Sequence, residues 1–308
     1  MMQSHKYKLS ICILTMNRCE QVLEAIDSCL ASVLPEKTQF VVVDNGSTDG
    51  TEAAVKHALQ TALKPFVYRK SPENIGVGPG RNLLYTLAEG EYAYFLDDDA
   101  VIAEPCRDTF FTVPLAYMDR NPCVYSLTTR ISDTALGYDR DAILSRAPKI
   151  DACAQMFMFH GGSHFLRVGA FHEPLYLALR YGYEELTPSL ETYAAGGRHV
   201  WMPEVYVVHQ PKVNKWKSGT ESAVRMRKID CYMPYVLKRR IYPRCLLPVL
   251  WFLFRLRMRR HLAGDAQAKR ECLAEAKELY RKLGAEKTEK LRFCTVLHLV
   301  KDFGVTAL

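Results

Sequence analysis

Three consecutive aspartates, Asp97, Asp98 and Asp99, follow the apolar run Tyr92–Leu96. In an extended chain, side chains two residues apart share a face, so we expect Asp97 and Asp99 to project together and Asp98 to point elsewhere. Neighbouring carboxylates repel one another unless a cation neutralises them, and a hard divalent ion with oxygen ligands can do so while it holds a diphosphate. The alternative is a solvated acidic loop. The position after a buried strand favours the metal site.

A glycine-rich segment, Asn74-Ile-Gly-Val-Gly-Pro-Gly-Arg-Asn82, precedes an expected helix at 82–88. Glycine lets the backbone approach a ligand closely, and Arg81 at the helix start can pair with phosphate oxygens. The same segment alone would also fit a tight left-handed loop. It indicates a phosphate site only together with the aspartates.

The elements that must position these residues alternate between strand and helix. The patterns predict strands at 9–15, 39–43, 65–69 and 92–96, and helices at 20–33, at about 50–63 and at 82–88. This alternation predicts a parallel sheet with right-handed crossovers, in which ligands bind at the carboxyl ends of the strands. Polar clusters lie at three such ends, at 15–18, 44–47 and 97–99. The sequence therefore predicts a small-molecule site, and a nucleotide is the favoured ligand.

The second half of the chain is less regular. We expect a strand at 154–159, a helix that Thr187 caps and Pro188 opens and that ends at Gly196-Gly197, and a strand at 205–209. Residues 126–150 allow no assignment. A domain boundary is placed near Asn214, which gives domains at 1–214 and 215–308, with a charged helix at 266–283 in the second.

Composition and charge narrow the class of protein. The 308 residues are 48% apolar and 24% charged, as in a globular protein, and ten scattered cysteines without a Cys-x-x-Cys pair argue against a disulfide scaffold. With no secretory leader recognised, we expect a cytoplasmic chain. Eight lysines and arginines lie between Asp230 and Asp265 without one acidic residue, and they exceed the net charge of +7. The basicity is therefore local, which argues against nucleic acid and for a local anionic partner.

Four spaced motifs resemble the family 2 inverting glycosyltransferases of GT-A fold. They are Ser10-Ile-Cys-Ile-Leu-Thr-Met-Asn-Arg18, Val42-Val-Asp-Asn-Gly-Ser-Thr-Asp-Gly50, the segment 74–82, and Asp97-Asp-Asp99 as the family's DXD motif. With weaker matches the resemblance extends to about Pro211. It implies an α/β fold with a Rossmann-like, mostly parallel sheet flanked by helices, here followed by a helical C-terminal extension.

The resemblance also implies roles for individual residues. Donor-nucleotide binding falls to Thr15, Asn17, Arg18, Asp44, Asn45, Asn74, Gly76, Arg81, Asp97 and Asp98. Asp99 and His209 would bind Mn²⁺ or Mg²⁺. The pair Glu184–Glu185 stands where the family has its catalytic base, with Glu in place of the usual Asp, and either residue fits. Without the upstream motifs, this pair would be explained as first-turn acids favoured by the helix dipole.

The implied reaction is the inverting transfer of a sugar from a nucleotide-diphosphate donor, UDP-sugars being favoured, to a glycan or lipid-linked glycan. The apolar run 245–254 is too short to span a bilayer, but with its arginines the segment 238–260 fits an anionic membrane surface, at the cytoplasmic face. The alternative to that contact is a helix packed on the catalytic domain. Two other functions stay open, a sugar-nucleotide nucleotidyltransferase and a non-catalytic sugar-nucleotide-binding module. The first is disfavoured because residues 15–20 contain no glycine.

Overall fold

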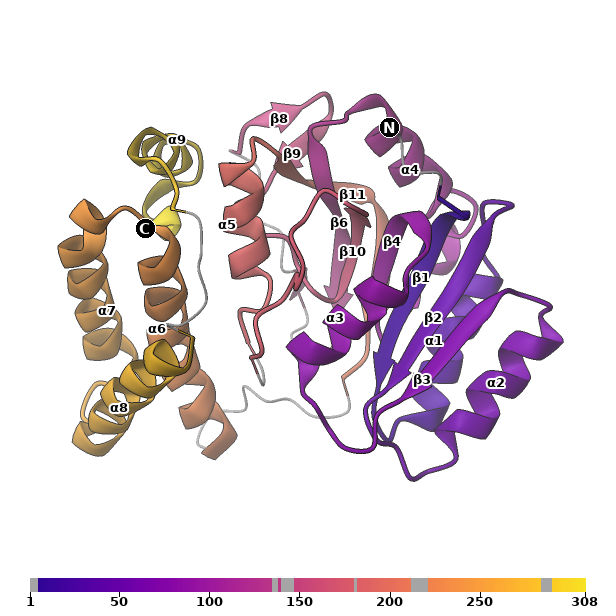
Figure 1. Cartoon of the computed structure of the whole chain (residues 1–308), viewed down its shortest axis with the longest axis horizontal. Helices are drawn as coiled ribbons and strands as arrows, with labels where there is room; N and C mark the ends of the chain where they lie inside the picture. Colours follow the sequence, from indigo (N-terminus) through magenta and orange to yellow (C-terminus); the bar gives the residue numbers. More distant parts are fainter. Residues whose placement is uncertain (1–4, 135–137, 140–146, 180–181, 212–220, 284–289) are drawn as a thin grey trace. The chain divides into compact units, whose positions relative to one another are not determined.

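A computed structural model of the chain describes residues 5–134, 138–139, 147–179, 182–211, 221–283 and 290–308. The chain divides into two compact units. The first unit comprises 1–185 and 197–211, and the second comprises 186–196 and 212–308 (Figure 1). The expected boundary near Asn214 lies in 212–220, outside the described residues.

The first unit begins with the predicted alternation of strands and helices. Its first seven elements are β1 (Tyr7–Thr15), α1 (Cys19–Leu30), β2 (Thr38–Asp44), α2 (Thr51–Thr61), β3 (Phe66–Lys70), α3 (Val77–Leu87) and β4 (Gly90–Asp97). The elements that follow are β5 (Ala100–Ile102), η1 (Glu104–Cys106), α4 (Thr112–Arg120), β6 (Val124–Asp133), β7 (Tyr138–Asp139), β8 (Lys149–Ile150), β9 (Cys153–Gln155), β10 (Ser163–Arg167) and β11 (Arg198–His209).

One mixed, mostly parallel sheet organises this unit. Its main path runs β3-β2-β1-β4-β10-β6-β11-β9-β8, and β5 and β7 pair with β11 and β6. The first four strands are parallel, which confirms the expected crossovers. β10 is antiparallel to both β4 and β6 and joins them, and β11 runs parallel to β6. The carboxyl ends of β1, β2, β4 and β11 therefore all point the same way.

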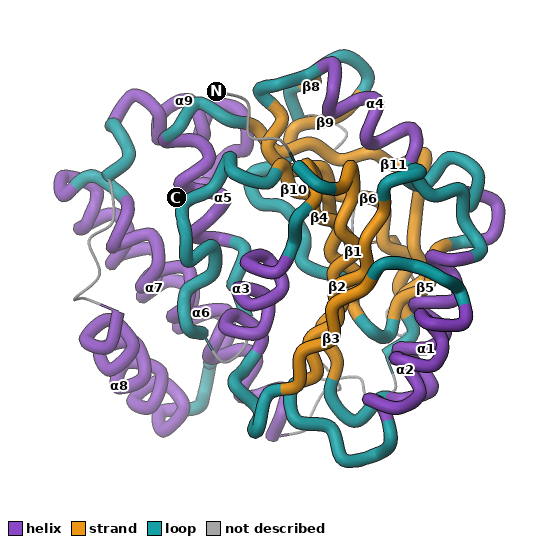
Figure 2. Tube along the Cα trace, turned by 45° about the vertical axis from the view of Figure 1, so that its right-hand side comes forward, coloured by secondary structure: helices purple, strands orange, loops and turns teal. Residues whose placement is uncertain are grey.

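Helices cover both faces of the parallel half of the sheet. In Figures 1 and 2 the strands lie between α3 on one side and α1 with α2 on the other. The side chains follow the two-residue period of a strand. Leu9, Ile11 and Ile13 of β1 belong to the core under α1 and α2, whereas Cys12 belongs to the core under α3.

The glycine-rich segment departs from the prediction, because α3 begins at Val77 rather than at 82. Two of its glycines therefore lie inside the helix. A Cβ on Gly78 would stand 2.3 Å from the carbonyl oxygen of Leu177, and one on Gly80 would stand 2.6 Å from Cδ1 of Leu14. Both glycines thus let α3 pack closely on the rest of the unit. Gly76, at φ +90°, occupies the position before the helix, where a left-handed backbone favours glycine.

Three further expectations in the second half need correction. The strand predicted at 154–159 ends at Gln155, and the helix predicted to begin at Pro188 begins at Leu186. β6 begins at Val124, and its residues 126–133 fall in the stretch left unassigned. It contains buried polar residues, and these are paired across the sheet, Ser126 with His199 and Thr129 with Ser163. Hydropathy could not reveal a buried strand whose polar groups are satisfied by distant partners.

The second unit is helical. It contains α5 (Leu186–Ala194), α6 (Glu221–Ile241), η3 (Arg244–Leu246), α7 (Leu247–His261), α8 (Ala266–Leu283), α9 (Phe293–Phe303) and η4 (Gly304–Ala307). α5, α7 and α8 each pack against α6. The helix predicted at 266–283 is confirmed as α8. Among the described residues, no helix combines the length and the apolar character needed to cross a bilayer.

Candidate active site

Loops at the carboxyl ends of β1 and β2 hold each other through asparagine side chains. Asn17, with φ +51°, accepts a hydrogen bond from the Thr48 backbone N–H, and its own N–H donates to Ser47 Oγ at 2.8 Å. Asn45 Nδ2 donates to Asn74 Oδ1 at 3.0 Å, and Asn45 Oδ1 accepts from the Ile75 N–H. Asn17, Asn45 and Asn74 are therefore brought together as predicted, and in this structure their side chains fix the loops.

Asp44, the last residue of β2, is fully buried. Its two carboxylate oxygens accept hydrogen bonds from the Ser47 backbone N–H at 2.7 Å and from the Tyr68 hydroxyl at 2.5 Å. Burial and the Asp44 carboxylate raise the pKa of Tyr68 above its usual range. Tyr68 therefore remains a hydrogen-bond donor and orients Asp44 at the strand end.

The middle aspartate points toward β1. Asp98 Oδ2 accepts from Thr15 Oγ1 at 2.8 Å, and Arg18 Nη1 lies 2.7 Å from Asp98 Oδ1 and 2.8 Å from Asp99 Oδ2. Burial raises the pKa of Asp98 to about 6, against the opposing effect of Arg18. Thr15, Arg18 and Asp98, three predicted nucleotide-site residues, thus form one connected group.

Asp97, Asp99 and His209 form a second group. Each residue has one possible metal-ligand atom within 4.8 Å of those of the other two. Asp97 and Asp99 therefore project to the same side, as expected for residues two apart in an extended chain. His209 Nε2 is 3.1 Å from Asp99 Oδ1, and its Nδ1 is 3.0 Å from Asp133 Oδ2. Burial opposes protonation of the imidazole, but the two carboxylates outweigh it and raise the pKa of His209.

This donor set suits a divalent metal ion. Two carboxylates and one imidazole, with a further carboxylate to orient the imidazole, are ligands that Mn²⁺ and Mg²⁺-type sites use. Asp99 and His209 were the predicted ligands, and the geometry adds Asp97 to them. Asp133 lies at the end of β6, in the stretch that the sequence left unassigned, and only its spatial neighbour His209 reveals it.

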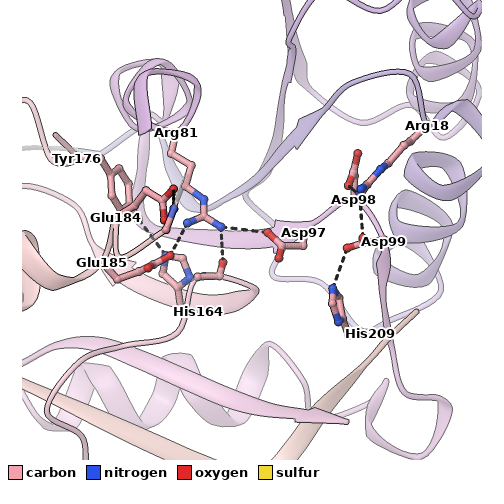
Figure 3. Close-up of polar contacts among 12 residues, drawn as sticks. Arg18, Arg81, Asp97, Asp98, Asp99, His164, Tyr176, Glu184, Glu185 and His209 are labelled. Atoms are coloured by element: carbon pink, nitrogen blue, oxygen red, sulfur yellow. Dashed lines mark hydrogen bonds and ion pairs between the residues drawn. The ribbon is translucent and has the colours of Figure 1, made fainter. Parts of the chain in front are cut away.

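Arg81 connects the aspartates to the late acid pair. Its Nη1 is 2.6 Å from Glu185 Oε1, and its Nη2 is 3.1 Å from Asp97 Oδ1 and 3.1 Å from the Gly161 carbonyl oxygen (Figure 3). Burial opposes the charged form of Arg81, but Glu185 and Asp97 outweigh it and hold its pKa above the ordinary value. In Figure 3, Asp97 lies between Arg81 and Asp99, so the two groups of residues are continuous.

Gly161 is the residue against which this ion pair packs. A Cβ at that position would stand 2.0 Å from Glu185 Oε1 and 2.6 Å from Arg81 Nη1. A Cβ on the neighbouring Gly162 would meet Asp97 Oδ2 at 3.2 Å. The glycine pair at 161–162 therefore leaves room for the charged side chains themselves.

Glu184 has a different environment from its neighbour. It is 5% exposed, and one of its oxygens accepts a hydrogen bond from the Gly182 N–H at 2.5 Å. Burial, and then the charge of Glu185, raise the pKa of Glu184 to about 7. A carboxylate with a pKa near neutrality is suited to accept a proton at physiological pH.

An aromatic wall, which the sequence did not predict, surrounds Arg81. The guanidinium lies 5.8 Å from the ring of Tyr176, whose hydroxyl is 3.3 Å from His164 Nε2. His164 is fully buried and stacks on Phe95. Burial, and then Arg81, keep the pKa of His164 well below its usual value. The side chains of Arg81 and Glu185 are only 9% and 11% exposed, and nothing in the local sequence of Tyr176 or His164 signals their position beside Arg81.

Comparison with known proteins supports these observations. Residues 10–171 match the model of glycosyl transferase family 2. The chain is 31% identical over 123 residues to the abequosyltransferase RfbV of Salmonella typhimurium, which covers 38% of this chain and 34% of that protein. It is 32% identical over 96 residues to a cholesterol galactosyltransferase of Borreliella burgdorferi, covering 31% and 26%. The chain thus spans about a third or less of the length of these relatives.

Solved structures agree with the expected fold. The chain resembles S. aureus TarS 1-349 in complex with UDP-GlcNAc with a TM-score of 0.61 and 14% identity, over 97% of this chain and 89% of that one. It resembles the mannosyltransferase PcManGT of Pyrobaculum calidifontis in complex with GDP-Man and Mn²⁺ with a TM-score of 0.58 and 19% identity, over 91% and 83%. At such identities the likeness concerns the fold alone, and it confirms the predicted GT-A architecture with a helical C-terminal region.

Proposed function

The chain belongs to glycosyl transferase family 2, and from that premise we propose that it transfers a sugar, with inversion, from a nucleotide-diphosphate donor to a hydroxyl acceptor. One observation carries the proposal. Arg81 contacts both Glu185, at the position of the catalytic base, and Asp97, beside Asp99 and His209. Acids nearly a hundred residues apart along the chain therefore meet in one site.

The donor we propose is a nucleotide sugar, with UDP-sugars favoured. Among the structural neighbours, TarS was solved with UDP and with UDP-GlcNAc, and PcManGT with GDP-Man. In this chain the nucleotide would lie over the interlocked loops at 15–18, 44–47 and 74–76. Arg18, with 38% of its side chain exposed, is placed to exchange its aspartate partners for donor oxygens.

Mn²⁺ or Mg²⁺ would be held by Asp97, Asp99 and His209 and, when bound, would neutralise charge on the leaving diphosphate. The chain's own residues supply the rest of the electrostatics. Arg81 places a fixed positive charge in a dry environment beside the same carboxylates. A preorganised charge of this kind stabilises negative charge that develops as the donor bond breaks.

The proton acceptor would be Glu184 or Glu185. An acceptor hydroxyl is a poor nucleophile until a carboxylate removes its proton as the new bond forms. Glu185 is oriented by Arg81 in a 2.6 Å ion pair, whereas Glu184 has the pKa near 7. A single displacement with this carboxylate opposite the leaving group inverts the anomeric carbon.

The acceptor we propose is a glycan or a lipid-linked glycan, used at the cytoplasmic face of a membrane with an anionic surface as second partner. Two of the relatives are an abequosyltransferase and a cholesterol galactosyltransferase, and the name of the second gives a lipid as its acceptor. Which acceptor this chain uses is a matter for a transfer assay with a panel of hydroxyl compounds.

The function is tested in two steps. A thermal-shift screen of nucleotide sugars with and without Mn²⁺ identifies the donor, because a ligand that binds only the folded state raises its melting temperature. Release of nucleoside diphosphate and transfer of sugar are then measured for the wild type, Glu184→Gln and Glu185→Gln. Replacing the base should lower transfer by a factor on the order of 10² to 10⁴ while donor binding stays within a few-fold.

Three outcomes would contradict the proposal. Full turnover in both glutamine variants would remove the acid pair from the chemistry. Incorporation of the donor's nucleoside monophosphate into product would indicate a nucleotidyltransferase, and donor binding without hydrolysis or transfer would indicate a non-catalytic module.

A further inference from the structure

Helix α7 exposes a line of large apolar side chains. Val249, Phe252 and Leu256 are 39%, 65% and 50% exposed, and Trp251, which contacts Tyr235 and Phe254, is 43% exposed. Positions 249, 252 and 256 are three and four residues apart, so they lie along one side of the helix. Large apolar groups gathered on one helix face mark an interaction site rather than scattered surface residues.

The opposite side of α7 is already in use. Leu250, Phe254 and Met258, each four residues apart, are buried. Phe254 stacks on Tyr235 of α6 with ring centroids 4.6 Å apart. The helix is thus fixed to α6 by one face, and its exposed face is apolar in the first half of the helix.

Cations flank this apolar line at both ends. The exposed Arg255, Arg259 and Arg260 lie in the second half of α7, and the exposed Arg244 precedes the helix by three residues. Arg255 lies 5.8 Å from the ring of Trp251. Side chains with a charged head and an apolar stem at such positions extend toward a polar interface while their neighbours enter an apolar layer.

A second group of cations gathers where α6 ends. The Leu291 N–H donates to the Ile241 carbonyl at 2.8 Å, which places Lys290 beside the end of the helix. Lys290 Nζ donates to the Arg239 carbonyl oxygen at 3.3 Å and to the Arg240 carbonyl oxygen. Burial, and then the nearby cations Arg244, Arg240 and Arg239, lower the pKa of Lys290. Between Asp230 and Asp265 the sequence contains no acidic residue.

From these placements we propose that α7 lies in the headgroup layer of an anionic lipid bilayer. Val249, Phe252 and Leu256 enter the acyl boundary, and Arg244, Arg255, Arg259, Arg260 and Lys290 contact lipid phosphates. This assignment develops the membrane contact of the proposed function and names the surface that makes it. Self-packing of two copies through this face is disfavoured, because it would bring the arginines of one α7 against those of the other.

The experiment is flotation of the full chain with vesicles of phosphatidylcholine alone and with vesicles that also contain phosphatidylglycerol. We expect binding only to the anionic vesicles, decreasing as salt is added. Each arginine near an anionic surface contributes about 1 kcal/mol, and 1.4 kcal/mol is a tenfold change. The variant Arg255→Ser/Arg259→Ser/Arg260→Ser should therefore bind about 100-fold more weakly.

Two matched variants make the test specific. Arg270→Ser/Lys277→Ser/Arg281→Ser removes three exposed cations from α8 and should change binding by less than about threefold. Phe252→Ser/Leu256→Ser keeps every charge and should weaken binding about tenfold or more, whereas Leu63→Ser, at a 90% exposed position of the first unit, should not. Circular dichroism melting verifies that each variant is folded.

Equal losses from the α7 and α8 charge variants would mean a diffuse electrostatic attraction and would overturn the proposal, as would equal binding to neutral vesicles. Sedimentation velocity without lipid tests whether a second copy of the chain covers the exposed face of α7 instead. A dimer that Phe252→Ser/Leu256→Ser dissociates would assign the face to a second copy of the chain. Release of nucleoside diphosphate from the donor is measured on the same variants. A failure of the membrane proposal is therefore distinguishable from a failure of the catalytic proposal.

Discussion

Among single residues, Arg81 links the two halves of the site. Breaking a buried ion pair by removing one partner leaves an uncompensated charge, at a cost of about 3–5 kcal/mol. Glu185, Asp97 and the Gly161 carbonyl satisfy this guanidinium together. A change to any of them is therefore expected to alter both stability and chemistry.

The pKa of Glu184 gives the chain a pH-dependent stability. Its folded pKa, about 7, lies above the ordinary value of 4.5, so the folded state binds the proton more tightly than the unfolded state does. The contribution of this group to stability is therefore largest at low pH and is lost as pH rises from 4.5 through 7. Glu184→Gln should raise the free energy of unfolding at pH 8 by roughly 1–3 kcal/mol, reduced by the cost of any hydrogen bond that the glutamine loses. At pH 5 the increase should be much smaller.

Urea denaturation at the two pH values measures this difference directly. Glu185→Gln serves as the matched control, because it removes a carboxylate that Arg81 compensates and should destabilise the fold at both pH values. An equal effect of Glu184→Gln at pH 5 and pH 8 would contradict the assignment.

Asp133 orients the imidazole of a predicted metal ligand. Partners of this kind typically alter metal affinity 10- to 100-fold when they are replaced. We expect Asp133→Asn to weaken Mn²⁺ binding by about that factor, measured by calorimetric titration, without abolishing it. Asp99→Asn should cost more, and unchanged Mn²⁺ affinity in both variants would remove this cluster from metal binding.

Gly161 and Gly162 form a matched pair of positions. In Gly161→Ala the new methyl group would overlap the Arg81–Glu185 pair, whereas in Gly162→Ala it would meet Asp97 at 3.2 Å. Sugar transfer should fall by about 100-fold or more in the first variant and by less than about tenfold in the second. Comparable activities would show that this ion pair is not needed in the reacting complex.

On the scale of elements, two glycines allow α3 to pack closely against the backbone at Leu177 and the side chain of Leu14. The Cβ of Gly78→Ala would stand 2.3 Å from a backbone carbonyl, which cannot move without shifting the chain at Leu177. The Cβ of Gly80→Ala would meet the flexible end of Leu14. Because alanine itself favours a helix by about 1 kcal/mol over glycine, Gly80→Ala should be nearly neutral, and Gly78→Ala should destabilise the chain by about 2 kcal/mol or more. Thermal melting of the two variants tests this order.

For the whole molecule, the chain divides into two compact units, and the predicted ligands would bind in the first. A ligand present at 100 times its Kd stabilises the state it binds by about 2.7 kcal/mol, which corresponds to roughly 5–10 °C for a unit of this size. Scanning calorimetry with saturating nucleotide and Mn²⁺ should therefore shift one unfolding transition and leave another in place. A single transition that shifts as a whole would mean that the units unfold together.

The residue patterns alone determined the alternation of β1 through β4 with their helices, because the strand and helix periods are local properties of the chain. They also placed Thr15, Asp44 and Asp97 at the carboxyl ends of strands. This was sufficient to predict a parallel sheet and the edge at which its site forms. In the structure these three strands, β1, β2 and β4, lie side by side. β6 was missed because its buried serine and threonine side chains are satisfied by residues far along the chain.

Only the tertiary structure decided which side chains meet. Arg81 and Glu185 are 104 residues apart, and His209 and Asp133 are 76 apart. Their pairing depends on β10, which enters antiparallel between β4 and β6 and brings Gly161 and Gly162 against Asp97 and Arg81. A local pattern contains no information on strand order of this kind, since order is set by the packing of complete elements. In the second unit, α7 packs on α6 through its buried side, which includes Leu250, Phe254 and Met258, and this packing leaves the opposite face of α7 exposed.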